Sequence, residues 1–314
     1  MRWTHKALLQ RWIAALPARA SQYLYFVVQR HLGGLRLTDP WSYLDTARGI
    51  ADRQAGQGGT LDSAVVLEVG TGRSVMLPIG LWLLGAQRVY TYDLNTYLRE
   101  ELVLEDIDAL RRAPGRVLGL LRGNEEMHKR LRSLQVASSL ESVLDLAAIE
   151  YVSPGDARRT ELPDRSIDLH VSRSVLEHIP SSQLADILVE ASRLLKDNGL
   201  AIHLVDFSDH FSHSDASISA INFLRFSEHE WRKIAGNRFM YHNRLRCDDL
   251  VELMTSAGLS MKGVEPTIDD RALEVLHEGF ALDRRFARKP PETNATRSAW
   301  VVAGLPRGDF TSRL

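Results

Sequence analysis

A glycine-rich run and an aspartate that follows it are the residues in this sequence best suited to bind a ligand. Residues 68–74 read Glu-Val-Gly-Thr-Gly-Arg-Ser. Gly70 and Gly72 allow a sharp turn and let a ligand approach the backbone closely. Asp93 stands about 20 residues further on, where a carboxylate can accept hydrogen bonds from both hydroxyls of a ribose. The pattern predicts a site for a nucleoside-containing cofactor; a glycine turn with a capping aspartate is the plain alternative.

The residues around the glycines indicate which cofactor this is. A dinucleotide needs a third glycine and a helix N-terminus to hold its pyrophosphate, and here Ser74 stands in place of that glycine. Glu68 precedes the glycines, and its carboxylate would repel a pyrophosphate but suits the ammonium group of a methionine moiety. The run therefore favours S-adenosylmethionine over a nicotinamide dinucleotide.

These residues must be positioned by alternating strands and helices, because strand-like and helix-like patterns follow one another along the chain. Short apolar runs predict strands at 65–69, 89–93, 149–152, 167–171, 200–207, 260–264 and 299–303. Apolar residues at helical spacing predict helices at 76–84, 181–196 (with a serine N-cap) and 248–257, and a capping box at 227–230 opens another. The alternation predicts a doubly wound, Rossmann-like α/β sheet that is mostly parallel.

The composition along the chain predicts two parts. Residues 1–60 are expected to form an N-terminal helical segment that ends in the glycine-rich stretch 56–59, and residues 61–314 the α/β domain. Residues 97–149 are helical in character and longer than the usual connection between two strands. They predict a helical insertion at about 98–148, a cap over the active site that influences the choice of substrate.

Five ordered motifs resemble those of the class I S-adenosylmethionine-dependent methyltransferases. The first two are residues 68–74 and the Tyr-Asp-Leu-Asn run that contains Asp93. The others are Gly-Asp-Ala at 155–157 with Leu-Pro-Asp-Arg-Ser-Ile-Asp at 162–168, Ser-Arg-Ser-Val-Leu-Glu-His-Ile at 172–179, and Leu-Leu-Lys-Asp-Asn-Gly-Leu at 194–200. The resemblance spans about residues 64–208 and implies a Rossmann-like methyltransferase fold, S-adenosylmethionine as the cofactor and methyl transfer as the reaction.

The resemblance also implies roles for single residues. Gly70 and Gly72 would lie alongside the methionine part of the cofactor, and Asp93 would bind its ribose. Asp156 would accept a hydrogen bond from the adenine amine, and the backbone of Ala157 would donate one. The other residues expected at the cofactor are Glu68, Thr71, Ser74, Leu94, Ser172 and His178. More loosely, residues 78–81, 205–211, 222–226 and 243–246 make the chain similar to bacterial methyltransferases found with cell-surface polysaccharide and secondary-metabolite genes. This resemblance indicates no firm substrate.

Residues that follow the predicted strand 200–207 are the candidates for catalysis. Methyl transfer to an oxygen needs a base whose pKa lies near the working pH, and in open α/β sheets the reaction site lies beyond the carboxyl ends of the strands. His210 is the predicted general base, with Asp209 or Asp206 orienting its imidazole ring. Capping roles in a polar loop are the alternative. No recognised metal-ligand spacing occurs here, so no metal is expected.

The overall composition limits the partners of the protein. The chain has 39 Lys and Arg against 40 Asp and Glu, a net charge of −1, which gives no electrostatic reason for a nucleic-acid partner. Cys247 is the only cysteine, and no apolar run approaches the length of a membrane helix. We therefore expect a cytoplasmic location and a small or neutral acceptor; the sequence indicates no oligomeric state.

The start of the chain is basic. Six Lys and Arg residues precede the first acid, Asp39, and apolar residues between Trp3 and Leu16 recur near helical spacing, which predicts a basic amphipathic helix. Such a helix could make a weak contact with an anionic membrane surface or serve as a transit peptide. We favour a helix packed on the domain, with its arginine stems lying along the surface.

Two other classes of function compete with a methyltransferase. One is a regulatory protein that binds S-adenosylmethionine without turnover, which the absence of product with any acceptor would favour. The other is a nicotinamide-dependent dehydrogenase, which the acid at Glu68 disfavours. Tighter binding of NAD than of S-adenosylhomocysteine would favour the dehydrogenase.

Overall fold

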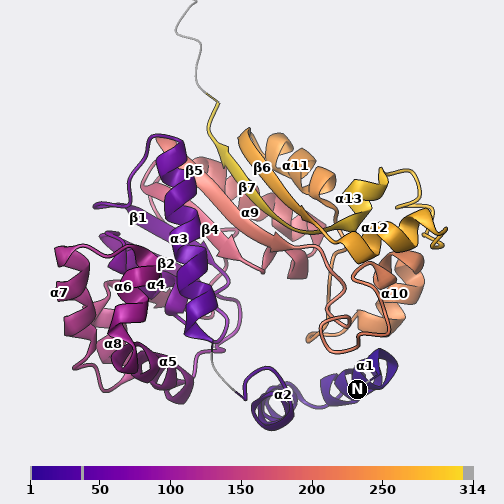
Figure 1. Ribbon diagram of the computed structural model, residues 1–314, viewed down its shortest axis with the longest axis horizontal. Coiled ribbons are helices and arrows are strands. Elements are labelled where there is room, and N and C mark those ends of the chain that lie inside the picture. The colour runs from indigo at the N-terminus through magenta and orange to yellow at the C-terminus, as the bar shows by residue number, and fades with distance from the viewer. Residues whose placement is uncertain (1, 37–38, 307–314) are drawn as a thin grey trace, which may run out of the picture.

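One mixed sheet organises the fold in the computed structural model, which describes residues 2–36 and 39–306 (Figure 1). In this described part, seven strands run in the order β3-β2-β1-β4-β5-β7-β6. They are β1 (Val65–Val69), β2 (Arg88–Tyr92), β3 (Ile149–Val152), β4 (Ile167–Arg173), β5 (Leu195–Asp206), β6 (Ser260–Ile268) and β7 (Thr296–Gly304). Strands β1 to β5 pair in parallel, and β7 runs antiparallel to β5 and β6. The predicted Rossmann-like α/β fold is confirmed.

The order of the strands reverses between β1 and β4. From β1 the chain moves outward through β2 to β3, and it then returns to place β4 on the other side of β1. The loops that follow β1 and β4 therefore leave the sheet on opposite sides, which opens a crevice at the carboxyl ends of these strands. The glycine-rich residues 70–72 directly follow β1 and so begin at this crevice.

Helices α3 (Pro40–Gly56) and α4 (Met76–Leu83) cover one face of the sheet. Asp39 caps α3 by accepting a hydrogen bond from the Ser42 N–H. Leu44 and Ile50 of α3 are fully buried in the same core as Val66 of β1. Residues 1–60 therefore do not pack as one separate segment, because α3 belongs to the core of the sheet.

The predicted helical insertion is present between β2 and β3. It comprises α5 (Glu100–Arg112), α6 (Pro114–Leu121), α7 (Glu125–Leu134) and α8 (Leu140–Leu146). Its buried side chains, among them Leu110, Val117 and Leu131, join the core that contains α3 and α4. No residue of 98–148, all of which the structure describes, lines the cavity at the crevice. The predicted position as a cap over the site is therefore wrong, because the apolar stripes of these helices are buried against the sheet layer instead.

The opposite face of the sheet is covered by α9 (Ser181–Leu194) and α11 (Cys247–Ser256), whose buried leucines pack on Leu67 and Val69. Helix α9 begins where predicted, but Pro180 occupies its N-cap position and no side chain caps it, so the predicted serine cap is wrong. The helix ends at Leu194.

The capping box predicted at 227–230 is confirmed. The Ser227 hydroxyl accepts from the Glu230 N–H, and the Glu230 carboxylate accepts from the Ser227 N–H in return. This exchange opens α10 (Glu228–Ala235). The remaining elements are η1 (Leu176–His178), η2 (Asn222–Arg225), α12 (Asp270–His277) and α13 (Pro291–Ala295).

The first two helices lie apart from the sheet, at the lower right of Figure 1; they are α1 (Trp3–Ala14) and α2 (Ala18–Leu32). Trp3 packs on Phe211 and Phe226, with ring centroids 5.7 and 6.0 Å away. Leu8 and Trp12 lie on the outer face of α1, where Trp12 is 70% exposed. Helix α1 is thus packed on the protein while its outer face remains apolar. Across residues 2–36 and 39–306, none of the helices is both long and apolar enough to span a bilayer.

Candidate active site

A cavity of about 440 Å³ lies at the carboxyl ends of β1, β2 and β4. Its volume is within the range of roughly 300–1,000 Å³ that is usual for small-molecule sites. Of the residues predicted to bind the cofactor, those that line it are Gly70, Gly72, Asp93, Leu94, Asp156, Ala157 and His178. The crevice therefore brings together residues from four of the five sequence motifs.

The two glycines have left-handed backbone conformations, with φ of 84° at Gly70 and 64° at Gly72. A Cβ atom at Gly70 would lie 2.5 Å from both methyl groups of Val175, whereas at Gly72 no atom lies within 4 Å of that position. Gly70 is therefore needed for packing of the loop against the turn after β4. Gly72 leaves its side of the cavity open for a ligand.

Asp93 is held at the end of β2 by two backbone donors. Its Oδ2 accepts from the Gly72 N–H at 2.8 Å, and its Oδ1 accepts from the Asn95 N–H at 2.8 Å. Burial raises the pKa of Asp93, and these two donors oppose that effect. A carboxylate fixed in this way at the cavity wall keeps lone pairs for the two hydroxyls of a ribose.

The loop after β3 supplies the opposite end of the cavity. Asp156 and Ala157 line it together with Leu94, a residue that is 58% exposed. The Asp156 carboxylate is bound on both oxygens by Arg158, with Nε–Oδ1 at 2.9 Å and Nη2–Oδ2 at 2.7 Å. Hydrogen bonding to Arg158 lowers the pKa of Asp156. Asp156 is thus a fixed acceptor, and Leu94 offers an apolar surface for a planar base.

Glu68, which the sequence assigns to the cofactor, is not among the residues lining the cavity. Side chains alternate along a strand, so Glu68 shares the face of Val66, which packs toward α3 and α4. Glu68 is 3% exposed, and its carboxylate accepts a hydrogen bond from the Thr91 hydroxyl. Burial raises the pKa of Glu68 to about 8. The structure therefore places a largely neutral carboxyl beneath the glycine loop.

Three other predicted cofactor residues also have buried side chains outside the lining. They are Thr71, which hydrogen-bonds Thr91, Ser74, which donates to Asp106, and Ser172, which hydrogen-bonds His203. These side chains fix the loop and the strand ends, and they do not face the cavity.

Several lining residues were not found from the sequence. Tyr25 of α2 stacks on Phe239 with ring centroids 4.0 Å apart, and both line the cavity with Arg238. Arg73 also lines it, with its guanidinium 5.1 Å from the ring of Tyr97. No local pattern relates Tyr25 to Phe239, because packing of α2 against a distant segment brings the two rings together.

The predicted catalytic residues lie behind His178, away from the glycine loop. His210 Nε2 is 3.4 Å from Asp206 Oδ2. Burial opposes ionisation of Asp206, but the pKa of its carboxyl is lowered because His210 and Ser208 stabilise the charged form. Asp209 instead accepts from the Phe211 N–H and the Asn222 amide, and burial raises its pKa to about 6. Of the two candidates to orient His210, Asp206 is the one beside its ring.

The turn η1 after β4 carries Glu177 and His178 between the cavity and this histidine. His178 Nδ1 lies 2.8 Å from the carbonyl oxygen of Tyr241. Burial lowers the pKa of His178 to about 4 and raises that of Glu177 well above its usual range. The Asn243 amide donates to the carbonyls of Leu176 and Ile179 and so clamps both ends of the turn.

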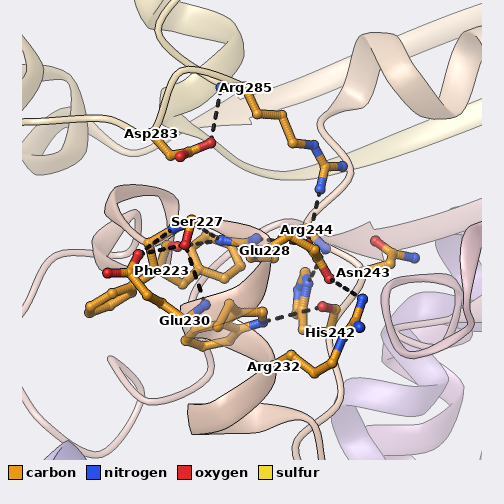
Figure 2. A network of polar contacts seen from close by, with 12 residues as sticks. Phe223, Ser227, Glu228, Glu230, Arg232, His242, Asn243, Arg244, Asp283 and Arg285 are labelled. Carbon is orange, nitrogen blue, oxygen red and sulfur yellow. Dashed lines mark hydrogen bonds and ion pairs between the residues drawn. The ribbon is translucent and has the colours of Figure 1, made fainter.

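A buried polar network holds the segment that carries Tyr241 to Asn243 (Figure 2). Arg244, 1% exposed, donates to the Phe223 carbonyl at 3.0 Å and pairs with Glu228 at 2.8 Å. The Arg244 N–H donates to His242 Nδ1 at 2.9 Å. Of these residues, Tyr241 lines the cavity and the others support it.

A second cavity of about 310 Å³ adjoins the first, since Ser174 lines both. Its polar lining includes Asp206, Thr267, Arg297 and Ser298. Ser174 has a left-handed backbone with φ of 50° and donates its N–H to the Leu204 carbonyl at 2.8 Å. The carboxyl end of β4 therefore separates a nucleoside-sized cavity from a smaller polar one.

The fold and this crevice define an α/β protein built to bind a nucleoside cofactor at a strand-order reversal. Residues 107–203 match the family model of a methyltransferase domain. The chain thus contains a methyltransferase domain over these residues, which implies S-adenosylmethionine-dependent methyl transfer. The match runs from α5 into β5 and begins after Asp93. No curated protein matches the sequence.

Solved structures of methyltransferases are similar to the chain at low identity. An S-adenosylmethionine-dependent methyltransferase from Clostridium acetobutylicum is 10% identical, with 91% of this chain and 98% of that chain covered and a TM-score of 0.45. The magnesium protoporphyrin IX methyltransferase of Synechocystis is 13% identical, with 84% and 83% covered and a TM-score of 0.44. The phosphoethanolamine N-methyltransferase 2 of Haemonchus contortus is 14% identical, with 83% and 53% covered and a TM-score of 0.46.

Proposed function

We propose that the protein methylates a hydroxyl oxygen of a small-molecule or glycan acceptor. The observation that carries this proposal is the smaller cavity beside the cofactor cavity, whose lining includes Asp206, with His210 Nε2 3.4 Å from the Asp206 carboxylate. When bound in the cofactor cavity, S-adenosylmethionine supplies an electrophilic methyl group.

The residues of the cavity fit this cofactor in three places. Asp93 would accept from the ribose hydroxyls, and the open side of Gly72 would admit the methionine chain. Leu94 and Ala157 would contact the adenine, whose amine would donate to Asp156. These are the roles that the resemblance implies, and the place of each residue in the lining supports them.

The acceptor would bind in the polar cavity on the other side of Ser174. Asp206, Arg297 and Ser298 offer both acceptors and donors, as recognition of a hydroxylated molecule requires. His210, with Asp206 beside it, would take the proton from the acceptor hydroxyl. Positioning of the hydroxyl oxygen in line with the methyl group would supply much of the remaining rate.

Calorimetry followed by a product assay tests the proposal. Purified protein should bind S-adenosylmethionine and S-adenosylhomocysteine, and should release S-adenosylhomocysteine with acceptors from a panel of sugars, glycans and phenols. Mass spectrometry of the product should place the methyl group on oxygen. Cofactor binding without product from the panel would favour a regulatory binding protein, tighter binding of NAD would favour a dehydrogenase, and a methylated nitrogen would refute the proposed atom.

We also propose a weak contact of α1 with anionic membrane surfaces. The exposed Leu8, Leu9 and Trp12 lie beside Arg11, and the chain has no acidic residue before Asp39. Sedimentation with phosphatidylglycerol vesicles, but not with phosphatidylcholine vesicles, is the expected result. Equal sedimentation with both would remove the electrostatic part of this proposal.

A further inference from the structure

Four histidine rings gather beside the cofactor cavity, between the turn after β4 and the loop after β5. The ring of His210 lies at the centre, with centroids 4.9 Å from His178, 5.3 Å from His242 and 5.0 Å from His213. Such crowding of imidazoles is unfavourable for several protonated rings at once, because like charges repel. The group is suited to hold a cation only when the rings are neutral.

Glu177 adds a carboxylate to this group. Glu177 is 2% exposed; in the part of the chain that the structure describes, no side chain donates to its carboxyl oxygens, and the nearby donors are the backbone N–H groups of Glu177 and Asp206. A carboxylate has about four lone-pair sites, so these backbone donors leave part of its capacity to accept unused. A bound cation would use the remaining lone pairs.

The donor atoms of Glu177, His178 and His210 converge. One donor atom from each lies within 4.8 Å of the other two. Donors around a tetrahedral zinc ion lie roughly 3.3 Å apart, given the usual zinc–ligand distances. Side-chain rotations that move each donor atom by about 1 Å would therefore bring all three within bonding distance of one ion.

The surroundings of the two histidines match those of metal ligands. A histidine bound to a metal usually donates its other ring N–H to a carbonyl or a carboxylate, which fixes the ring. His178 has the Tyr241 carbonyl 2.8 Å from its Nδ1, so its Nε2 remains available. His210 has the Asp206 carboxylate 3.4 Å from its Nε2.

We propose that Glu177, His178 and His210 bind a divalent transition-metal ion, represented by zinc, next to the cofactor cavity. Two imidazoles and one carboxylate form a ligand set that leaves a fourth position for water or substrate. The sequence did not reveal it, because the two ligating segments are separated along the chain and show no recognised spacing.

The proposal concerns binding and does not depend on the identity of the acceptor. Where it meets the proposed function, it changes the role of His210, because a ligand nitrogen cannot also take a proton. A bound ion would instead lower the pKa of an acceptor hydroxyl. Chelation then distinguishes the two modes: it abolishes turnover if the ion activates the hydroxyl and leaves turnover intact if His210 acts as a free base.

The test is zinc binding to the full chain, measured without any acceptor. After treatment with a chelator, calorimetric titration with zinc should give one ion per chain, confirmed by elemental analysis. Glu177→Gln and His210→Ala should each weaken zinc affinity by at least about 100-fold, since even partners outside the ligand shell contribute 10- to 100-fold. His128→Ala, which removes an exposed histidine of α7, should leave it unchanged.

X-ray absorption spectroscopy of the wild-type protein with zinc bound tests the ligand set without any variant, so it applies even if a variant fails to fold. It should report two imidazole nitrogens and a carboxylate oxygen. Any of four results would overturn the assigned site. They are no zinc binding by the wild-type protein, unchanged zinc affinity in both ligand variants, an equal loss of zinc affinity in His128→Ala, and three or more imidazole nitrogens in the absorption spectrum.

Discussion

Removal of the Asp93 carboxylate should weaken binding of S-adenosylmethionine strongly. Each hydrogen bond to a charged acceptor contributes about 1.5–3 kcal/mol, and a ribose presents two hydroxyls to this side chain. Loss of one to two such bonds in Asp93→Ala costs about 1.5–6 kcal/mol, which corresponds to a rise in Kd of at least about tenfold. Calorimetry with S-adenosylhomocysteine measures this directly, without turnover.

The two backbone donors make Asp93→Asn a sharper variant. Asp93 accepts from Gly72 on one oxygen and from Asn95 on the other. An asparagine has one acceptor oxygen, so its NH2 group must face one of these N–H donors. We expect a loss of affinity between those of the wild type and of Asp93→Ala.

A control variant separates charge from position. Asp197→Asn removes a carboxylate whose side chain is 94% exposed and which does not line the cavity, so its Kd should equal that of the wild type. Wild-type affinity in a folded Asp93→Ala protein, as judged by circular dichroism, would refute the assignment of Asp93 to the ribose.

Three further variants test the loop, the buried acid and the turn. Gly70→Ala places a Cβ 2.5 Å from the Val175 methyl groups and should lower the free energy of unfolding by more than Gly72→Ala does. At Gly72 the only cost is the strain of a left-handed backbone, about 1 kcal/mol. Equal losses of stability in chemical denaturation would contradict this prediction. The pKa of Glu68 is raised to about 8 by burial, so the folded state binds the extra proton and wild-type stability falls as pH rises from about 5 to 8. Glu68→Gln has no titrating group at this position and does not lose stability in this way. Its free energy of unfolding, minus that of the wild type, should therefore rise by on the order of 3 kcal/mol as pH increases over that range. A difference that does not change with pH would refute this prediction. Asn243→Ala removes the clamp on η1 and should reduce turnover at least tenfold with a smaller change in cofactor affinity; a loss confined to affinity would contradict it.

Local features of the sequence predicted the frame of the site. Short β-branched runs define strands by themselves, and a glycine turn needs only its own backbone freedom, so β1, the loop with Gly70 and Gly72, and the position of Asp93 followed from the sequence. To predict where the Glu68 side chain points, the alternation of side chains along β1 must be considered as well. Two residues before Gly70, it shares the face of Val66, and strand alternation would have directed it toward the core.

Contacts between distant segments could not be predicted in this way. Tyr25 and Phe239 meet only because α2 packs against the segment before α11. The pairing of His178 with His210 likewise depends on β4 and β5 lying side by side. The apolar stripes of the helical insertion show that its helices must cover a core, but the sequence does not say which core.

The turn η1 links the two halves of the site. Its first flanking residue, Val175, packs where a side chain on Gly70 would be, so the turn fixes the glycine loop from outside. Its last residues, Glu177 and His178, face the histidine group on the other side. Asn243 holds both ends of the turn through backbone carbonyls. A shift of η1 would therefore alter cofactor binding and the environment of the acceptor together, which is why a substitution remote from both ligands should affect turnover.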